Sequence, residues 1–132
     1  MKIKYYFPLV LLLTGCSLFE GHAYDFAYKA IDELSKHVEI STVEIKNALY
    51  HPYEEDDELN ELVVLYYYYD EENIEDLDAY AMYSYNKEED TYKFTIGDQA
   101  EMYFYFATGM DNENYDSLKV KRLNNYIEKE LI

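Results

Sequence analysis

Residues 62–72, "LVVLYYYYDEE", decide how the rest of this chain is interpreted. Four aliphatic residues are followed by four consecutive tyrosines and then by three acidic residues. An apolar run of this length, bounded by polar sequence, is typical of a strand that is buried on both faces. Successive side chains of a strand point to opposite faces, so Tyr66 pairs with Tyr68, and Tyr67 with Tyr69. The stretch therefore predicts a central strand and not a platform of four adjacent rings.

The two tyrosine pairs need not have the same role. Tyrosine rings bury well when the hydroxyl finds a partner, so one pair is expected in the core beneath a helix. The other pair either completes a core or joins tyrosines of neighbouring strands in a half-exposed aromatic face, and a large exposed patch of this kind usually marks an interaction site. The candidate interaction face consists of Tyr67, Tyr69, Tyr83, Tyr85, Tyr103 and Tyr105.

The segments on either side of the tyrosine run predict an α+β fold. Apolar residues recur every three or four positions over residues 23–38, which indicates a helix. Alternation predicts further strands over residues 79–85, 92–96 and 101–109, and a helical stripe over residues 118–131 ends the chain. Short connections imply antiparallel pairing. The predicted order is an N-terminal helix, an antiparallel meander of four to five strands and a C-terminal helix, with the helices on one face of the sheet.

Two segments before the tyrosine run are harder to interpret. The β-branched residues of 38–50 favour a strand with a bulge near Thr42. Alternatively, Ser41 and Glu44 form a capping box that would begin a short helix. We prefer the strand. Residues 51–61 contain a proline and five consecutive acidic residues, a composition that predicts a loop.

Length and charge limit the classes of function. A chain of 132 residues is long enough for one domain with a modest core. Its 28 acidic and 11 basic residues give a net charge of -17, which keeps a protein soluble and repels polyanions. We therefore expect no nucleic-acid partner.

The first 17 residues, "MKIKYYFPLVLLLTGCS", form a distinct segment. Lys2 and Lys4 are followed by an apolar run over residues 5–13, which matches the charged and hydrophobic regions of a signal peptide. The run is too short to span a bilayer, because a transmembrane helix needs about 20 apolar residues. It ends in Leu13, Thr14, Gly15 and Cys16, and this motif resembles the lipobox that signal peptidase II recognises in bacterial lipoproteins. The resemblance covers residues 1–17 alone.

The resemblance implies a division of the chain into three parts. Residues 1–15 would be a cleaved signal peptide, residues 16–21 a lipidated Cys16 with a short tether, and residues 22–132 a single acidic, tyrosine-rich domain. A diacylglyceryl cysteine supplies the two chains that stable anchoring needs. The domain would then lie outside the cytoplasm, anchored to the cell membrane or to an outer membrane. Because Cys16 is the only cysteine, the chain forms no internal disulfide.

No pattern in the sequence predicts catalysis or a bound metal. His22, His37 and His51 are far apart and lack the spacing of metal ligands. The acidic clusters lack the glycine and the alternating ligand positions of a calcium loop. Nucleotide-binding and hydrolase motifs are also missing. We therefore expect no cofactor, no metal and no enzymatic activity.

Two hypotheses for the function remain. The first is a non-catalytic interaction module, anchored to the membrane through Cys16, that binds a basic envelope or secreted protein. The alternative is a lipoprotein that binds a small ligand or a cation such as calcium. The first hypothesis uses the strong negative charge of the chain directly, and we prefer it for that reason.

Overall fold

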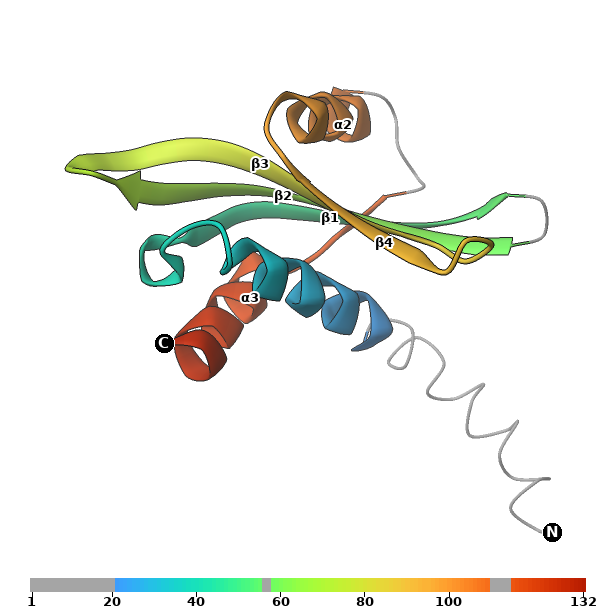
Figure 1. Ribbon diagram of the computed structural model, residues 1–132, viewed down its shortest axis with the longest axis horizontal. Coiled ribbons are helices and arrows are strands. Elements are labelled where there is room, and N and C mark those ends of the chain that lie inside the picture. Colours follow the sequence, from blue (N-terminus) through green and yellow to red (C-terminus); the bar gives the residue numbers. More distant parts are fainter. Residues whose placement is uncertain (1–20, 56–57, 110–114) are drawn as a thin grey trace, which may run out of the picture.

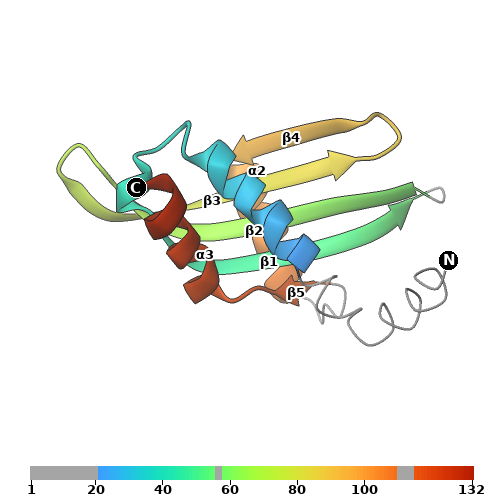
Figure 2. The ribbon, with the colours of Figure 1, turned by 90° about the horizontal axis from the view of Figure 1, so that it is seen from below.

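A five-stranded antiparallel sheet lies between helices on both of its faces in the computed structural model, which describes residues 21–55, 58–109 and 115–132 (Figure 1). The strand order is β4-β3-β2-β1-β5, so the first four strands form a meander. The helix formed by residues 21–34, called here the N-terminal helix, lies with α3 on one face, and α2 lies on the other (Figures 1 and 2). The predicted α+β fold is confirmed.

The helices and strands have the following bounds. The sheet contains β1 (Glu44–Glu55), β2 (Glu58–Glu71), β3 (Ile74–Asn86), β4 (Thr91–Ile96) and β5 (Asp116–Ser117). The remaining elements are a 3-10 turn, η1 (Ile40–Thr42), the helices α2 (Asp98–Gly109) and α3 (Val120–Tyr126), and a π-helical continuation of α3, η2 (Ile127–Leu131).

The tyrosine run occupies the centre of the sheet, as predicted. β2 is paired along its length with β1 on one side and with β3 on the other. Tyr67 is fully buried in the core between the sheet, the N-terminal helix and α3, and Tyr69 packs against that core. Tyr66 is on the opposite face, where its ring centroid is 5.6 Å from that of Phe104 in α2. Tyr67 and Tyr69 therefore belong to one core and Tyr66 to the other.

The N-terminal helix packs closely on the sheet because its buried stripe contains small residues. Ala27 and Ala30 are completely buried, together with Ile31 and Leu34. Alanine side chains let the helix backbone approach the strands, and the larger residues fill the space between. Burial of apolar surface of this kind is the main stabilising contribution to the fold.

The prediction of a strand over residues 101–109 is wrong, because these residues belong to α2. The buried side chains are Ala100, Phe104 and Ala107, which are spaced as one face of a helix. They pack with Met82 and Leu49 on the sheet face that is not covered by the other helices. The alternating aromatic residues of this segment therefore do not lie on two faces of a strand. Phe104 faces the sheet, and Tyr103, Tyr105 and Phe106 are exposed on other sides of the helix.

The predicted loop over residues 51–61 is also wrong, because β1 extends to Glu55 and β2 begins at Glu58. Pro52 is compatible with this strand for a positional reason. The Ala48 carbonyl accepts a hydrogen bond from Leu118 N on the β5 side, and Pro52, four residues on, has its nitrogen on that same side. β5 pairs only with Leu49 and Tyr50, so no ladder hydrogen bond is lost at the proline.

The strand interpretation of residues 38–50 is confirmed from Glu44 onward, and the capping-box helix is not formed. Thr42 belongs to the 3-10 turn, and the irregularity in the pairing lies between Ile45 and Asn47 instead of near Thr42. β3 begins at Ile74, five residues before the predicted start. Its first residues are mostly acidic and exposed, which is a composition typical of a turn. This composition is why the start of the strand was predicted too late.

Candidate functional site

The six tyrosines of the candidate interaction face do not share one surface. Tyr67 and Tyr83 are buried beneath the helices, and Tyr69 and Tyr85 pack partly buried against the same core. Tyr103 and Tyr105 belong to α2 on the opposite side of the sheet. The prediction depended on residues 101–109 being a strand, and the face is lost because they form a helix.

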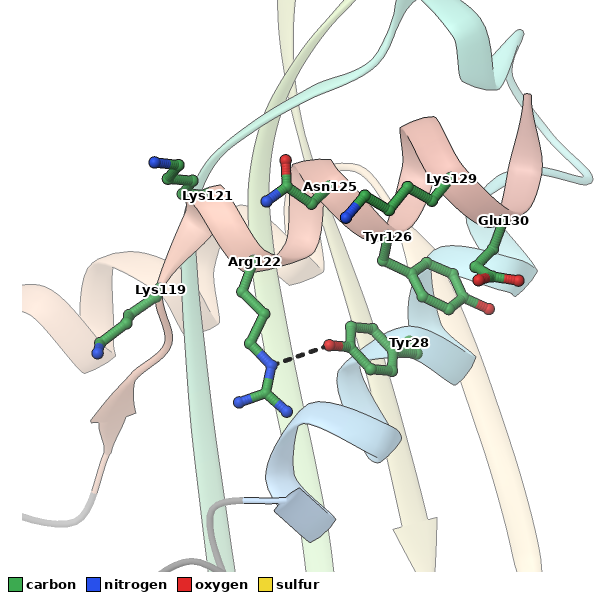
Figure 3. A pocket seen from close by; sticks show the side chains of 8 residues that line it. All are labelled: Tyr28, Lys119, Lys121, Arg122, Asn125, Tyr126, Lys129 and Glu130. Atoms are coloured by element: carbon green, nitrogen blue, oxygen red, sulfur yellow. Dashed lines mark hydrogen bonds between the residues drawn. The ribbon is translucent and has the colours of Figure 1, made fainter.

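A cleft of about 610 Å³ lies between the N-terminal helix and α3 (Figure 3). Seven of its eight lining residues come from one short stretch of sequence at α3 and η2. The lining residues are Tyr28, Lys119, Lys121, Arg122, Asn125, Tyr126, Lys129 and Glu130. Four of the eight are basic, although the chain as a whole is strongly acidic.

The floor of the cleft is held in place by aromatic and hydrogen-bonding contacts. The rings of Tyr28 and Tyr126 are stacked, with centroids 4.2 Å apart and planes 9° from parallel. Arg122 Nε donates to the Tyr28 hydroxyl at 3.0 Å, and its guanidinium carbon lies 3.8 Å from the Tyr24 ring centroid. Tyr126 donates its hydroxyl proton to Asp32 at 2.7 Å. Burial and this carboxylate raise the pKa of Tyr126 to about 12.

The rim of the cleft carries exposed lysines at regular spacing. Lys121, Asn125 and Lys129 are four residues apart and follow one side of α3 and η2 (Figure 3). Lys119 precedes the helix. None of the three lysines forms an ion pair within the part of the chain that the structure describes, and Glu130 is the one acidic side chain in the lining.

The sequence contains a signal for this basic cleft. Four of the 11 basic residues fall within the last 14 positions of the chain, and Lys121, Asn125 and Lys129 have helical spacing. Tyr28, the contribution of the N-terminal helix, has no such signal because it is about a hundred residues away in sequence.

A second cavity, of about 420 Å³, lies beside the N-terminal helix and contains a buried carboxylate. Glu61 is only 8% exposed. Its Oε1 is hydrogen-bonded to His22 Nε2 and accepts a hydrogen bond from the Tyr50 hydroxyl at 2.7 Å. Burial, and then the Glu61 carboxylate, raise the pKa of Tyr50, so this hydroxyl remains a neutral donor at physiological pH. The three groups satisfy one another and include no activated nucleophile.

The outer side of α2 exposes large apolar side chains. Met102 is 58% exposed, Tyr105 57% and Phe106 62%. These three residues are spaced i, i+3 and i+4, so they lie together on the side of the helix opposite the buried stripe. We call this group the α2 face. Asp98 and Glu101, in the first turn of α2, are its nearest acidic residues along the helix.

The histidines and acidic clusters do not form a metal site in the described residues. His37 stacks on Phe94 and His51 on Tyr115, with centroid distances of 5.5 and 4.7 Å. Among residues 21–55, 58–109 and 115–132 there is no group of three or more side chains that could hold a metal ion.

The lipobox residues Leu13, Thr14, Gly15 and Cys16 lie outside the described residues. In the described part of the chain, no helix has the length and apolar character needed to cross a membrane. Comparisons with protein-family models, with curated proteins and with solved structures find no match for this chain. Function is therefore inferred from the residues and contacts of the chain itself.

Proposed function

We propose that this chain is a membrane-anchored bacterial lipoprotein whose domain is a non-catalytic protein-interaction module outside the cytoplasm. Support for the anchor comes from the lipobox pattern that ends at Cys16. Support for the interaction module comes from one observation, the exposed α2 face formed by Met102, Tyr105 and Phe106.

The α2 face is unusual because the opposite side of the same helix is already buried. A surface helix normally has one apolar stripe facing the core and polar residues elsewhere. α2 buries Phe104 with two alanines and still exposes Met102 and Phe106 to more than half of their area. Exposed clusters of large apolar residues mark sites of protein interaction, and aromatic residues and methionine are enriched in such interfaces.

The charge of the chain indicates the chemistry of the partner. The net charge of -17 gives a field that attracts cationic proteins and repels acidic ones. Asp98 and Glu101 place carboxylates beside the apolar residues of the α2 face. The partner that fits is a basic envelope or secreted protein with an apolar contact surface of its own.

The alternative, a small-ligand site, receives less support from the geometry. The basic cleft has an aromatic floor, but Tyr28 and Tyr126 already stack on each other, with ring centroids 4.2 Å apart. An inserted aromatic ligand would have to separate these rings and break the hydrogen bond between Tyr126 and Asp32. The cleft is therefore better suited to contact with an extended anionic surface than to enclosing a small molecule.

Replacement of Cys16 with serine is expected to prevent lipid attachment, so that any protein whose leader is removed leaves the membrane fraction of its own cells. Serine is close to cysteine in size but has no thiol to form the thioether, so no diacylglyceryl group is attached. Mass spectrometry of the Cys16 peptide and fractionation of membranes measure the result. Replacement of Ser17 with alanine is the matched control and should leave the protein in the membrane. Unmodified Cys16 in the wild-type protein recovered from membranes would contradict lipid anchoring, whereas a Cys16→Ser precursor held there by its uncleaved apolar leader would not.

A photo-crosslinking residue at Met102 is expected to form an adduct with a partner protein in intact cells. The same residue at Lys93, exposed on β4, is the control position and should not form that adduct. The yield at Met102 should fall as ionic strength rises, because the attraction is partly electrostatic.

With the partner purified, Phe106→Ala should weaken binding about tenfold or more, whereas Thr91→Ala should leave it unchanged. Adducts with a second copy of this chain alone would show self-association and contradict the proposal.

A further inference from the structure

Acidic and basic residues are separated between the layers of the domain. The described residues 39–55, 58–109 and 115–118, which include the sheet and α2, contain 18 acidic and three basic residues. Residues 21–38 and 119–132, which form the helical layer on the other face, contain five acidic and six basic residues. The sheet and α2 are thus strongly acidic, whereas the helical layer, which contains the basic cleft, is nearly balanced in charge.

The basic cleft lies next to the start of the described chain. Lys119 N donates to the Tyr24 hydroxyl at 2.9 Å, and the Arg122 guanidinium carbon is 3.8 Å from the Tyr24 ring centroid. Tyr24 is in the first described turn of the N-terminal helix. Gly21 follows Cys16 by five residues, and five extended residues span at most ~18 Å. A lipid on Cys16 would therefore hold these basic side chains close to the headgroups.

We infer that the basic rim of this cleft, formed by Lys119, Lys121 and Lys129, docks on anionic lipid headgroups of the membrane that anchors the chain. The inference rests on the proposed lipid anchor and adds an orientation to it. A lysine near an anionic surface is attracted to its phosphates, and the attraction is largely screened beyond about 8–10 Å. The acidic layer is repelled by the same surface, so both effects favour one orientation.

This orientation determines which side of the domain is accessible. The N-terminal helix and α3 lie on one face of the sheet and α2 on the other (Figure 1). With the basic rim against the headgroups, the α2 face points away from the membrane. The stacked pair of Tyr28 and Tyr126 and the contacts of Arg122 keep α3 fixed to the tethered helix. Docking therefore presents the proposed partner surface without any conformational change.

Lysine labelling on vesicles tests the docking. The lipidated protein, purified in detergent, is incorporated into vesicles of phosphatidylcholine alone or with added phosphatidylglycerol, and an amine-reactive reagent is applied. Labelling of Lys121 and Lys129, read by mass spectrometry, should fall about fivefold on the anionic vesicles. Labelling of Lys93, on the acidic side, should not change. Added salt should restore labelling of the rim.

Two variants separate specific docking from general charge. In the double variant Lys121→Gln and Lys129→Gln, anionic vesicles should no longer protect Lys119 from the amine-reactive reagent. Lys119 is unchanged and reports the docking. Lys87→Gln with Lys93→Gln removes the same charge from the other side and should leave that protection intact. Both variants should retain the circular dichroism spectrum of the wild type.

Three results would overturn the inference. Equal labelling of the rim on both kinds of vesicle, with lipid present on Cys16, excludes docking and leaves the anchor in place. Absence of lipid from Cys16, measured in the same samples, overturns both proposals. Protection by inorganic phosphate on vesicles of phosphatidylcholine alone would assign the cleft to a soluble anion instead of a membrane.

Discussion

Raising the pH from 9 to 12 is expected to unfold the domain cooperatively, with the transition above pH 10. Burial raises the pKa of Tyr50 and of Tyr67 well above the ordinary value of 10.0. Below pH 10 both groups are neutral in the folded and the unfolded chain, so they do not change stability. Above pH 10 only the unfolded chain releases these protons, and stability falls by about 1.4 kcal/mol per pH unit for each tyrosine. Two tyrosines thus remove about 5 kcal/mol by pH 12, which is comparable with the whole stability of a small domain.

Circular dichroism and the ultraviolet absorbance of tyrosinate, recorded together, measure this transition. Tyr67→Phe should shift it to higher pH, because one of the two buried groups no longer titrates. The same change should raise stability at pH 7 by about 1 kcal/mol, since within the described residues the Tyr67 hydroxyl is buried without a hydrogen-bond partner. Tyr103→Phe, on the outside of α2, is the matched control. It should change neither the pH of the transition nor the stability at pH 7. Gradual titration of all tyrosines with no loss of structure would contradict the prediction.

Replacement of Asn124 with alanine is expected to lower the free energy of unfolding by about 3 kcal/mol. The Asn124 side chain takes the place of a strand partner at the edge of β1. Its Oδ1 accepts a hydrogen bond from Ile45 N at 2.7 Å, and its Nδ2 donates to Ile45 O at 3.0 Å. Ile45 is 1% exposed, so both backbone groups lose their partners when the amide is removed. They also lie at the irregularity between β1 and β2, where the ladder is weakest.

Chemical denaturation of the variant and the wild type gives the difference in free energy. Asn125→Ala changes an identical side chain in the next, exposed position and should alter stability by less than about 0.5 kcal/mol. The stability of Asn124→Asp should lie between that of Asn124→Ala and that of the wild type, because a carboxylate can accept a hydrogen bond from Ile45 N but cannot donate one to Ile45 O. Equal stability of the Asn124→Ala variant and the wild type would show that α3 is not needed to complete the edge of β1.

The elements with one strong periodicity could be predicted from the sequence. The apolar spacing over residues 23–38 and the run over residues 62–69 each have a single consistent interpretation. Both elements are present, although the N-terminal helix ends at residue 34 and not at 38. The division of the four tyrosines between two faces follows from strand geometry alone. That both faces are covered by helices could not be predicted in this way, because it depends on α2.

The segment that forms α2 could not be assigned from its pattern. Every residue from 102 to 107 is apolar or aromatic, so strand and helix spacings both fit. Ala100, Phe104 and Ala107 reveal the helix only once their burial is known. The candidate interaction face failed for this reason, since Tyr103 and Tyr105 had been assigned to the wrong type of element.

The basic cleft was missed for a different reason. Its rim comes from residues 119–129, but its floor requires Tyr28, and no sequence pattern brings these together. The net charge of -17 also hides a local excess of basic residues, because a sum over the chain contains no information about which layer each charge occupies. Charge counted along predicted elements would have indicated the rim, but not the cleft.

The open edge of β3 bears on whether neighbouring copies of the chain can pair with one another strand to strand. β4 pairs with β3 only from Ala81 onward, and Gly97 N donates to the Tyr80 carbonyl at 3.0 Å, so the outward-facing ladder groups of residues 74–79 have no neighbouring strand. Unpaired edges of this kind invite strands from neighbouring molecules, and copies held on one membrane by the proposed anchor would meet often. Glu75, Asp76 and Asp78 are exposed along this edge, and Asp76 has a φ of 55°, which interrupts the regular extended backbone. Two such edges would bring like charges together before any backbone pairing could form, and we therefore expect crowded copies to remain separate instead of polymerising edge to edge.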